Sequence, residues 1–330
     1  MSGVAGAAGT AGDADGLGPV VVLAGGVGGA KLAEGLQAHL ADRLSVIVNT
    51  GDDCWRHGLF VMPDHDTVLY TLAGMEQADL GWGIEGDTHA VMRQLGDYGE
   101  ETWFALGDRD IALHVARTAR LRDGRRLTEV CLGLQHPLGI AARILPMADE
   151  PVATGVRTGD GWLEFQEYFV HRRQAPDVLE LRFDGLEAAR PTPEVAAALE
   201  AARVIVIAPS NPLVSIGPIL AVPGMREGLL AARSRGARIA AVSPIVGGRA
   251  LKGPADRMLV SLGHESTAAG VAALYADLVD LFVLDRVDAG LAPAIEAMRI
   301  RPLVTDTIMT DDASRARLAA EVLRGVLATP

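Results

Sequence analysis

The stretch VVVLAGGVGGAKL, residues 20–32, joins a strand pattern directly to a helix pattern. Val20–Leu23 is an apolar, β-branched run typical of a buried strand in a parallel sheet. Leu32, Leu36 and Leu40 repeat at the i, i+4 spacing of one helix face. The turn between the two patterns contains four glycines: Gly25, Gly26, Gly28 and Gly29. A strand that leads at once into an amphipathic helix predicts an α/β fold.

The same alternation continues along the chain. Further strands are predicted at Ser45–Val48, Val204–Ala208, Arg238–Val242 and Leu281–Leu284. Further helices are predicted at Val91–Tyr98, Ile111–Leu121, Pro193–Ala201, Met225–Arg235 and Ala313–Leu327. This order predicts a three-layer α/β sandwich with a mostly parallel sheet. The middle of the chain differs, because residues 152–170 show period-2 runs on either side of Gly159–Gly161, which predicts a β-hairpin. We therefore expect a disordered tail over residues 1–18 and one domain over 19–330, with an insertion around 85–190.

Composition narrows the function. The 330 residues carry a formal charge of −12, which argues against a broad basic face for nucleic acid or an anionic membrane. Cys54 and Cys131 are the two cysteines, too few for a disulfide framework or a cysteine-rich zinc site. The sequence shows no secretory signal and no apolar run of the roughly 18 residues needed to span a bilayer. A cytoplasmic protein that acts on small molecules is the expectation.

The glycine turn predicts an anion site. Glycines allow close approach of the backbone to a ligand, and free N–H groups at a helix start favour phosphate. The spacing is neither the dinucleotide fingerprint G-x-G-x-x-G nor a Walker A loop, because Lys31 is not followed by Ser or Thr at the required offset. A tight strand–helix turn without a ligand remains the alternative.

Four carboxylates lie within 15 residues after the second predicted strand: Asp52, Asp53, Asp64 and Asp66. Hard oxygen ligands beside a phosphate site suggest Mg²⁺. The alternative is structural, with Asp66 capping the helix that follows. His57 and His65 are interleaved with the carboxylates and fit either a transition-metal site or ordinary polar neighbours. Cys54 fits a small buried residue better than a nucleophile.

Three further loops add polar groups. LGDRD, residues 106–110, fits either a helix cap with an ion pair or an arginine that orients a carboxylate or phosphate. Ser210 and Asn211 follow a buried strand, where small polar groups suit recognition of a base or phosphate. Residues 243–255 leave another strand with glycines and add Arg249 and Lys252. Loops at one sheet edge would together form one pocket.

Taken together, these blocks resemble the 2-phospho-L-lactate transferase family of coenzyme F-420 biosynthesis, whose actinobacterial members are phosphoenolpyruvate transferases. The resemblance is carried in family order by GGVGGAKL, NTGDD, PDHDTVLY, WGIEGDT, LGDRD, ILPMADE, APSNPLVSIGPIL and SPIVGG with KGPA. It implies a Rossmann-like fold, commonly as a homodimer. It also implies transfer of a phospholactyl or phosphoenolpyruvyl group from a guanosine-diphosphate donor to the ribityl hydroxyl of the deazaflavin Fo, with release of GMP and a requirement for Mg²⁺.

The resemblance also implies roles for residues. Asp52 and Asp66 would be catalytic and would hold the metal together with Asp53, and Asp66 would orient or deprotonate the Fo hydroxyl. The binding residues that it implies are Gly26, Val27, Gly28, Lys31, Asn49, Ser210, Asn211 and Trp82. Trp55 is a second candidate to stack on the deazaflavin. With Asp66 taken as a surface-loop residue, Asp66→Asn is expected to lose turnover and keep the fold, and Asp52→Asn to raise the Mg²⁺ requirement.

Two other functions remain as alternatives. A non-catalytic regulator that binds nucleotide sugars would share the glycine-rich start and an acidic segment, but it resembles PDHDTVLY and LGDRD much less. An NAD-dependent dehydrogenase is opposed by the glycine spacing and by Asn49 and Thr50, which stand where a ribose-binding acid would end the second strand. The sequence leaves open whether the donor carries lactate or enolpyruvate.

Overall fold

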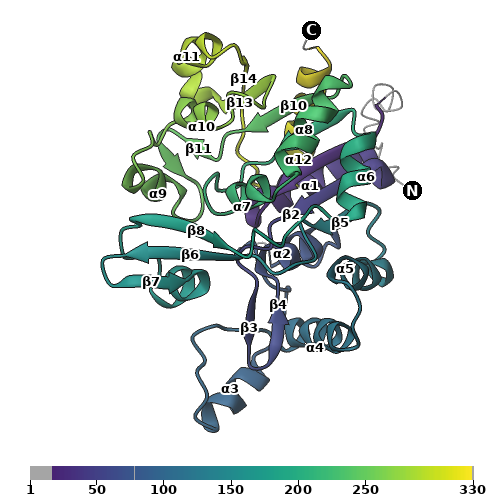
Figure 1. Ribbon diagram of the computed structural model, residues 1–330, viewed down its shortest axis with the longest axis vertical. Helices are drawn as coiled ribbons and strands as arrows, with labels where there is room; N and C mark the ends of the chain where they lie inside the picture. The colour runs from purple at the N-terminus through teal and green to yellow at the C-terminus, as the bar shows by residue number, and fades with distance from the viewer. Residues whose placement is uncertain (1–16, 78, 329–330) are drawn as a thin grey trace, which may run out of the picture.

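A parallel sheet of seven strands forms the centre of the computed structural model, which describes residues 17–77 and 79–328 (Figure 1). Most of the predicted tail, residues 1–16, lies outside the described residues. In spatial order the strands are β14 (Arg301–Thr305), β13 (Leu281–Asp285), β10 (Arg238–Val242), β9 (Val204–Ile207), β1 (Val20–Ala24), β2 (Leu44–Val48) and β5 (Arg143–Pro146). Every neighbouring pair is parallel. The predicted α/β architecture is confirmed.

The five central strands are those that the sequence predicts, and the two edge strands are additional. β14 begins with Arg301 and Pro302 and has one fully buried residue, so it lacks the apolar run of a central strand. β5 has four residues and ends at Pro146. Because β5 pairs with β2, the region around 85–190 contributes one strand to the main sheet besides the separate elements that it inserts.

Helices cover both faces of the sheet. One face carries α1 (Val27–Leu40), α2 (Pro63–Leu72) and α12 (Asp312–Leu327). The other carries α6 (Pro193–Ala201), α7 (Ile216–Ala221), α8 (Met225–Ser234), α9 (Ala255–Ser261), α10 (Ala268–Leu274) and α11 (Ala292–Ala297). Successive strand residues alternate between the two cores, as Val20 and Val21 do. Burial on both sides explains why these strands read as continuous apolar runs.

The middle of the chain forms smaller elements that extend from one end of the sheet (Figure 1). They are the hairpin β3 (Cys54–Arg56) and β4 (Leu59–Val61), helices α3 (Ala90–Asp97), α4 (Asp108–Arg122) and α5 (Leu127–Gln135), and the antiparallel strands β6 (Ala153–Thr158), β7 (Gly161–Glu164) and β8 (Glu180–Asp184). The predicted hairpin is confirmed as β6–β7. Its second strand is shorter than predicted, because Glu167–His171 forms a π-helical turn. The remaining elements are the two-residue strands β11 (Ile245–Val246) and β12 (Arg249–Ala250) and short 3₁₀ turns at Ala41–Arg43, His136–Leu138 and Arg286–Leu291.

The order of the strands fixes where a ligand would bind. From β1 the chain moves to β2 and β5 on one side, and it returns to the other side through β9, β10, β13 and β14. β1 and β9 are therefore neighbours at the point where the direction of winding reverses. In open α/β sheets, ligands bind beyond the carboxyl ends of strands at this point. Within the described ranges, no helix has the length and apolar character needed to cross a membrane.

Candidate functional site

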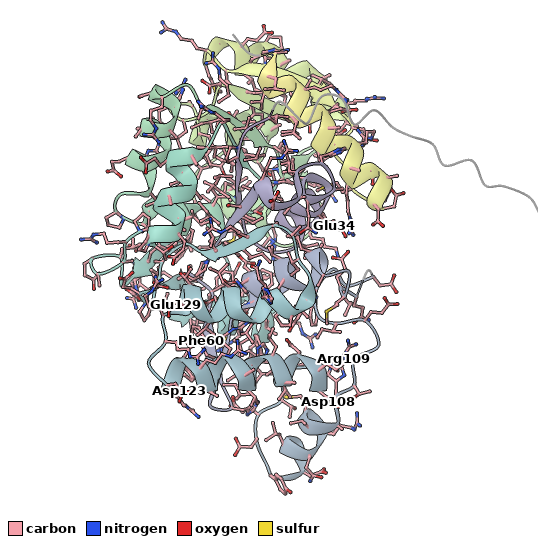
Figure 2. The ribbon with its side chains drawn as sticks, turned by 90° about the vertical axis from the view of Figure 1, so that its right-hand side faces the viewer. Glu34, Phe60, Asp108, Arg109, Asp123 and Glu129 are labelled. Carbon is pink, nitrogen blue, oxygen red and sulfur yellow. The ribbon has the colours of Figure 1, made fainter. Side chains whose placement is uncertain are left out.

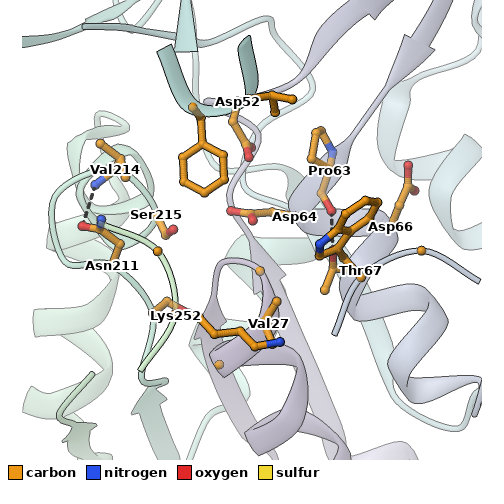
Figure 3. A pocket seen from close by; sticks show the side chains of 18 of the residues that line it. Val27, Asp52, Pro63, Asp64, Asp66, Thr67, Asn211, Val214, Ser215 and Lys252 are labelled. Carbon is orange, nitrogen blue, oxygen red and sulfur yellow. Dashed lines mark hydrogen bonds between the residues drawn. The ribbon is translucent and has the colours of Figure 1, made fainter. Parts of the chain in front are cut away.

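A cavity of about 740 Å³ lies at the carboxyl ends of the central strands (Figure 3). The loops that follow β1, β2, β9 and β10 form its floor, and residues 307–309 add to it from beyond β14. Residues 103–106 and 165–170 of the middle region form another wall. The convergence of loops predicted from the sequence is therefore confirmed.

The glycines after β1 let two loops meet. A Cβ on Gly28 would lie 2.2 Å from the Pro209 carbonyl oxygen, and one on Gly25 would lie 2.3 Å from Cβ of Ser215. The Gly25 N–H donates to Ser210 Oγ at 3.0 Å. Close packing against the β9–α7 loop thus explains why Gly25 and Gly28 have no side chain.

The start of α1 also faces the cavity. Gly26, Val27 and Gly28 line it, so their backbone is open to a ligand. The first turn of α1 contains no acidic residue of its own, although the Gly26 N–H donates to Asp64 of α2. The N-terminal end of a helix carries a partial positive charge, so this surface suits an anionic group.

Asp52 and Asp64 form a carboxylate pair in the cavity wall. Asn49 Nδ2 donates to Asp52 Oδ1 at 3.2 Å and to Asp64 Oδ2 at 3.0 Å. Asn49 Oδ1 accepts the Gly51 N–H at 2.8 Å, which fixes the orientation of the amide. Asn49 does not itself line the cavity, so its place is behind the two carboxylates. Figure 3 shows Asp52 and Asp64 turned toward the same space.

The pair carries negative charge that no basic side chain of the described residues neutralises. Burial, and then the charge of Asp64, raise the pKa of Asp52 well above its usual range. Burial raises the pKa of Asp64 to about 6, although Asn49 and the Gly26 N–H donate to it. Two such carboxylates are stabilised by a cation held between them.

Asp66 has a different environment. It lies in the first turn of α2, is 4% exposed and accepts two hydrogen bonds from the guanidinium of Arg117, one of them 2.9 Å long. Burial alone would raise the pKa of Asp66, but the Arg117 charge holds that pKa well below its usual range. The expectation that Asp66 is a surface-loop residue is wrong. Replacement by Asn would leave Arg117 buried without its counter-charge, so Asp66→Asn is expected to cost stability as well as turnover.

A polar network extends from Asp66 along α4. His114 Nδ1 lies 3.6 Å from Asp66, and His114 Nε2 lies 3.2 Å from Asp110. Asp110 also accepts a hydrogen bond from the Tyr70 hydroxyl. Asp66, Asp110 and His114 could together hold a metal ion by the spacing of their ligand atoms. The Arg117 guanidinium on Asp66 opposes a cation there, so the carboxylate pair is the better candidate.

The other acidic-segment residues lie away from the cavity. The carboxylate oxygens of Asp53 are buried without a hydrogen-bond partner in the described structure, and its side chain is not part of the cavity wall. His57 is exposed at the β3–β4 turn, where its φ is +49°. His65 is buried, with Nδ1 3.4 Å from Asp66 Oδ1. Cys54 is buried, as predicted, and burial raises the pKa of its thiol to about 12, which opposes a nucleophilic role.

The residues of LGDRD, 106–110, have two kinds of role: some make structural contacts, and others line the cavity. The Asp108 carboxylate accepts the N–H groups of Ala90 and Val91 at the start of α3, and Arg109 Nη1 donates to the Glu85 carbonyl. Figure 2 shows Asp108 and Arg109 together at one end of α4. The structural alternative thus holds for these two, whereas Asp110 reaches the cavity.

The aromatic residues of the cavity are mostly ones that the sequence did not single out. Trp82 lines the cavity and is 50% exposed, whereas Trp55 packs on Phe60 outside it. The additional aromatic lining residues are Trp103, Phe104, Phe165 and Phe169. The Trp103 ring stacks on His171 at a centroid distance of 4.8 Å, and Phe165 stacks on Phe169 at 5.3 Å. These residues give one end of the cavity a flat apolar surface.

The remaining predicted binding residues are also in the cavity. Lys31, Ser210 and Asn211 line it, and so does Lys252, whereas Arg249 does not. Asn211 Oδ1 accepts the Leu213 N–H at 2.9 Å, and its Nδ2 lies 3.6 Å from Met258 Sδ. The loop after β9 is therefore held rigidly beside the glycine turn.

Comparison with known proteins agrees with these features. The sequence profile of the family 2-phospho-L-lactate transferase CofD matches residues 20–321. The chain is 38% identical over 306 residues to the 2-phospho-L-lactate transferase of Methanosarcina mazei, with 92% of this chain and 99% of that protein covered. It is 43% identical over 311 residues to the phosphoenolpyruvate transferase of Streptomyces griseus, with 92% and 97% covered.

A solved structure shares the fold. A UPF0052 family protein from Bacillus halodurans superposes with a TM-score of 0.64 at 15% identity, over 93% of this chain and 99% of that one. The profile match extends from β1 into α12, so it contains every loop that forms the cavity. The chain belongs to the 2-phospho-L-lactate transferase CofD family.

Proposed function

We propose that this protein is a transferase of coenzyme F-420 biosynthesis that moves a phospholactyl or phosphoenolpyruvyl group from a guanosine-diphosphate ester to Fo and releases GMP. The observation that carries the proposal is one cavity that joins an open helix N-terminus, a carboxylate pair and an apolar aromatic wall. These three surfaces match the phosphates, a divalent cation and a flat ring system. The names of the relatives from Methanosarcina mazei and Streptomyces griseus support it.

The residues present fit Mg²⁺. Asp52 and Asp64 offer carboxylate oxygens, the ligands that Mg²⁺ prefers, and their pKa values are raised by burial that a cation would offset. The assignment changes two of the three ligands expected from the sequence: Asp64 replaces Asp66, and Asp53 is left out because it does not line the cavity. Bound Mg²⁺ would neutralise charge on the diphosphate and on departing GMP.

The reaction needs positioning more than covalent chemistry. The ribityl hydroxyl oxygen attacks the phosphorus that carries the organic acid, the bond to the GMP phosphate breaks, and the hydroxyl proton is released to water. Gly26, Val27 and Gly28 bind the donor phosphates through the backbone, and Ser210 and Asn211 contact the guanosine. Asp66 orients the attacking hydroxyl by accepting a hydrogen bond. Since Arg117 holds the pKa of Asp66 low, Asp66 is a weak proton acceptor.

The pKa of Asp64 gives a stability test. Its folded-state value of about 6 exceeds the unfolded value, so it favours the folded state at low pH and that contribution is lost as the pH rises through 6. Metal-free protein is expected to lose at most about 3 kcal/mol through this group between pH 4 and 7. Thermal unfolding of wild type and Asp64→Asn across that range measures it. MgCl₂ at pH 7 should raise the melting temperature of wild type and leave the variant unchanged; an equal rise in both would contradict the assignment.

The aromatic wall gives an affinity test. Phe169→Ala removes a stacked ring beside Phe165 and is expected to weaken Fo binding about tenfold, with GDP binding unchanged. Trp55→Ala serves as the matched control, because Trp55 is exposed outside the cavity. Titration of Fo fluorescence reports both. An equal loss of Fo affinity in Trp55→Ala would contradict binding of the deazaflavin ring at Phe165 and Phe169.

Binding also separates a transferase from a nucleotide-sugar regulator. The transferase predicts that GDP and Fo occupy one protein at the same time, since donor and acceptor must meet. Isothermal titration of Fo into GDP-saturated protein measures this. Failure of Fo to bind would favour the regulator. A homodimer and a cytoplasmic location remain predictions; light scattering checks the first.

A further inference from the structure

Both lysines of the chain lie at the proposed donor site. The sequence contains 28 arginines and two lysines, Lys31 and Lys252. They are 221 positions apart and belong to different elements, since Lys31 is on α1 and Lys252 is in the loop between β12 and α9. Both nevertheless line the same cavity. Arginine is thus used at the 28 other positions with a permanently cationic side chain, and both lysines are found in this one cavity.

The two ammonium groups flank the start of α1. Lys252 reaches across to Val27 (Figure 3), and a Cβ on Gly81 would lie 2.9 Å from Lys252 Nζ and 2.8 Å from Val27 Cγ1. Lys31 lies one helical turn after Val27. The charge of Lys252 is close enough to contribute to the lowered pKa of Lys31, after burial and Arg315. The pair therefore concentrates positive charge beside the helix N-terminus.

Neither ammonium pairs directly with a carboxylate, although the charges of Glu76 and Glu34 act on Lys31 from a distance. Lys31 Nζ donates to the Met309 carbonyl at 3.0 Å, and Lys252 Nζ donates to the Leu80 carbonyl at 2.6 Å. Neither lysine has an ion-pair partner among residues 17–77 and 79–328. The neighbouring Arg315 differs, because it pairs with Glu34 and Glu76. Both lysines therefore hold a weak neutral partner that a stronger, anionic acceptor can replace.

The negative charge of the bound donor would need more positive charge than one divalent cation supplies. The donor brings ionised phosphates and a carboxylate into a cavity that already contains Asp52 and Asp64. A single divalent cation offsets only part of that charge. Lysine suits the rest, because its compact ammonium turns its three N–H groups freely as the geometry at phosphorus changes, whereas guanidinium is a rigid fork.

We propose that Lys31 and Lys252 form a two-lysine clamp on the diphosphate of the donor, in which each exchanges its backbone carbonyl partner for phosphate oxygens. This inference rests on the proposed function and deepens it. In Figure 3 the Lys252 side chain extends toward Val27, and the Asp52 and Asp64 carboxylates lie on another side of the same cavity.

The lysine count makes a direct test possible. Lys31 and Lys252 carry the two side-chain primary amines of the sequence, so a water-soluble amine-acetylating reagent forms stable amides at these two and at the α-amine, and peptide mass spectrometry measures each rate separately. GDP with MgCl₂, at ten times its dissociation constant, should slow acetylation of both lysines about tenfold. The α-amine is the internal reference and should react at an unchanged rate.

Variants test the same clamp by affinity. Lys31→Gln and Lys252→Gln should each weaken GDP binding about tenfold or more, measured by calorimetry. Lys252→Arg keeps the charge and should lose less than Lys252→Gln. Arg249→Gln is the matched control, because Arg249 is exposed in β12, three residues before Lys252, and lies outside the cavity wall. Its GDP affinity should stay within about twofold of wild type.

The outcomes separate this inference from the proposed function. If GDP binds but both lysines are acetylated at the same rates as without GDP, the clamp is overturned and the donor assignment stays in place. If GDP protected only one of the two lysines from acetylation, the proposal that both bind the diphosphate would also be overturned. Wild-type protein that binds no GDP would overturn the proposed donor, and the clamp with it.

Discussion

Arg117→Met is expected to lower the free energy of unfolding by about 3–5 kcal/mol at pH 7. Arg117 is fully buried, and it donates to both Asp66 oxygens and to the Phe60 carbonyl. Its removal leaves the Asp66 carboxylate buried without its main counter-charge. Chemical denaturation monitored by circular dichroism measures the loss.

The pH dependence of that loss has a definite sign. In wild type, Arg117 holds the pKa of Asp66 below its unfolded value, so the ion pair stabilises the protein above that value and the contribution is lost as the pH falls. The difference between wild type and Arg117→Met should therefore shrink below about pH 4. Arg122→Met is the matched control, since Arg122 is exposed on the same helix. It should cost less than about 1 kcal/mol.

A double variant separates the ion pair from simple packing. Arg117→Met combined with Asp66→Asn leaves no uncompensated charge, so its loss should be smaller than the sum of the two single losses by about 1 kcal/mol or more. Additive losses would show that Arg117 matters only for the volume that it fills.

Asp64→Asn is expected to reduce turnover by about a hundredfold or more and to raise the Mg²⁺ concentration needed for half-maximal rate. The variant removes one charge of the carboxylate pair and leaves the Asn49 amide without an anionic acceptor on that side. Because a neutral amide replaces a carboxyl whose pKa is already raised, the fold should be kept. Initial rates across a MgCl₂ titration measure both effects, and Asp52→Asn should behave alike.

Asp53→Asn is the matched control for that experiment. Asp53 is next to Asp52 in the sequence, but its side chain is outside the cavity wall. Its turnover and Mg²⁺ requirement should stay within a few fold of wild type. A Mg²⁺ requirement that rises in Asp53→Asn and not in Asp64→Asn would reverse the metal assignment.

The central sheet could be predicted because strands that are buried on both faces have apolar residues at nearly every position. Val20–Leu23 and Val204–Ala208 are apolar throughout, so their position in a parallel sheet follows from the pattern alone. The edge strand Arg301–Thr305 lacks this signal, because it is covered less completely. The structure of the acidic segment was partly readable as well: Pro63 is a good first helical residue, which places Asp64 and Asp66 in the first turn of α2.

Contacts between residues far apart in the sequence could not be predicted from the local sequence pattern. Arg117 meets Asp66 across 51 positions, and no spacing rule links them. One signal was available. Asp110, His114 and Arg117 recur at i, i+4 and i+7 as a polar stripe where an apolar face is usual, with Asp110 directly before the predicted helix Ile111–Leu121 and the other two within it. Phe165 and Phe169 fit the pattern of a strand in the sequence, but Phe169 belongs to the π-helical turn Glu167–His171, and both rings line the cavity.

The most direct test of the account is a turnover assay with purified protein, Fo and MgCl₂, in which the lactyl and enolpyruvyl guanosine-diphosphate donors are supplied separately. Mass spectrometry follows GMP and the new phosphodiester. We expect equal amounts of both products from at least one donor, with a rate that falls in Asp64→Asn and not in Asp53→Asn. If folded protein releases GMP from neither donor and forms no phosphodiester, the transferase assignment is contradicted.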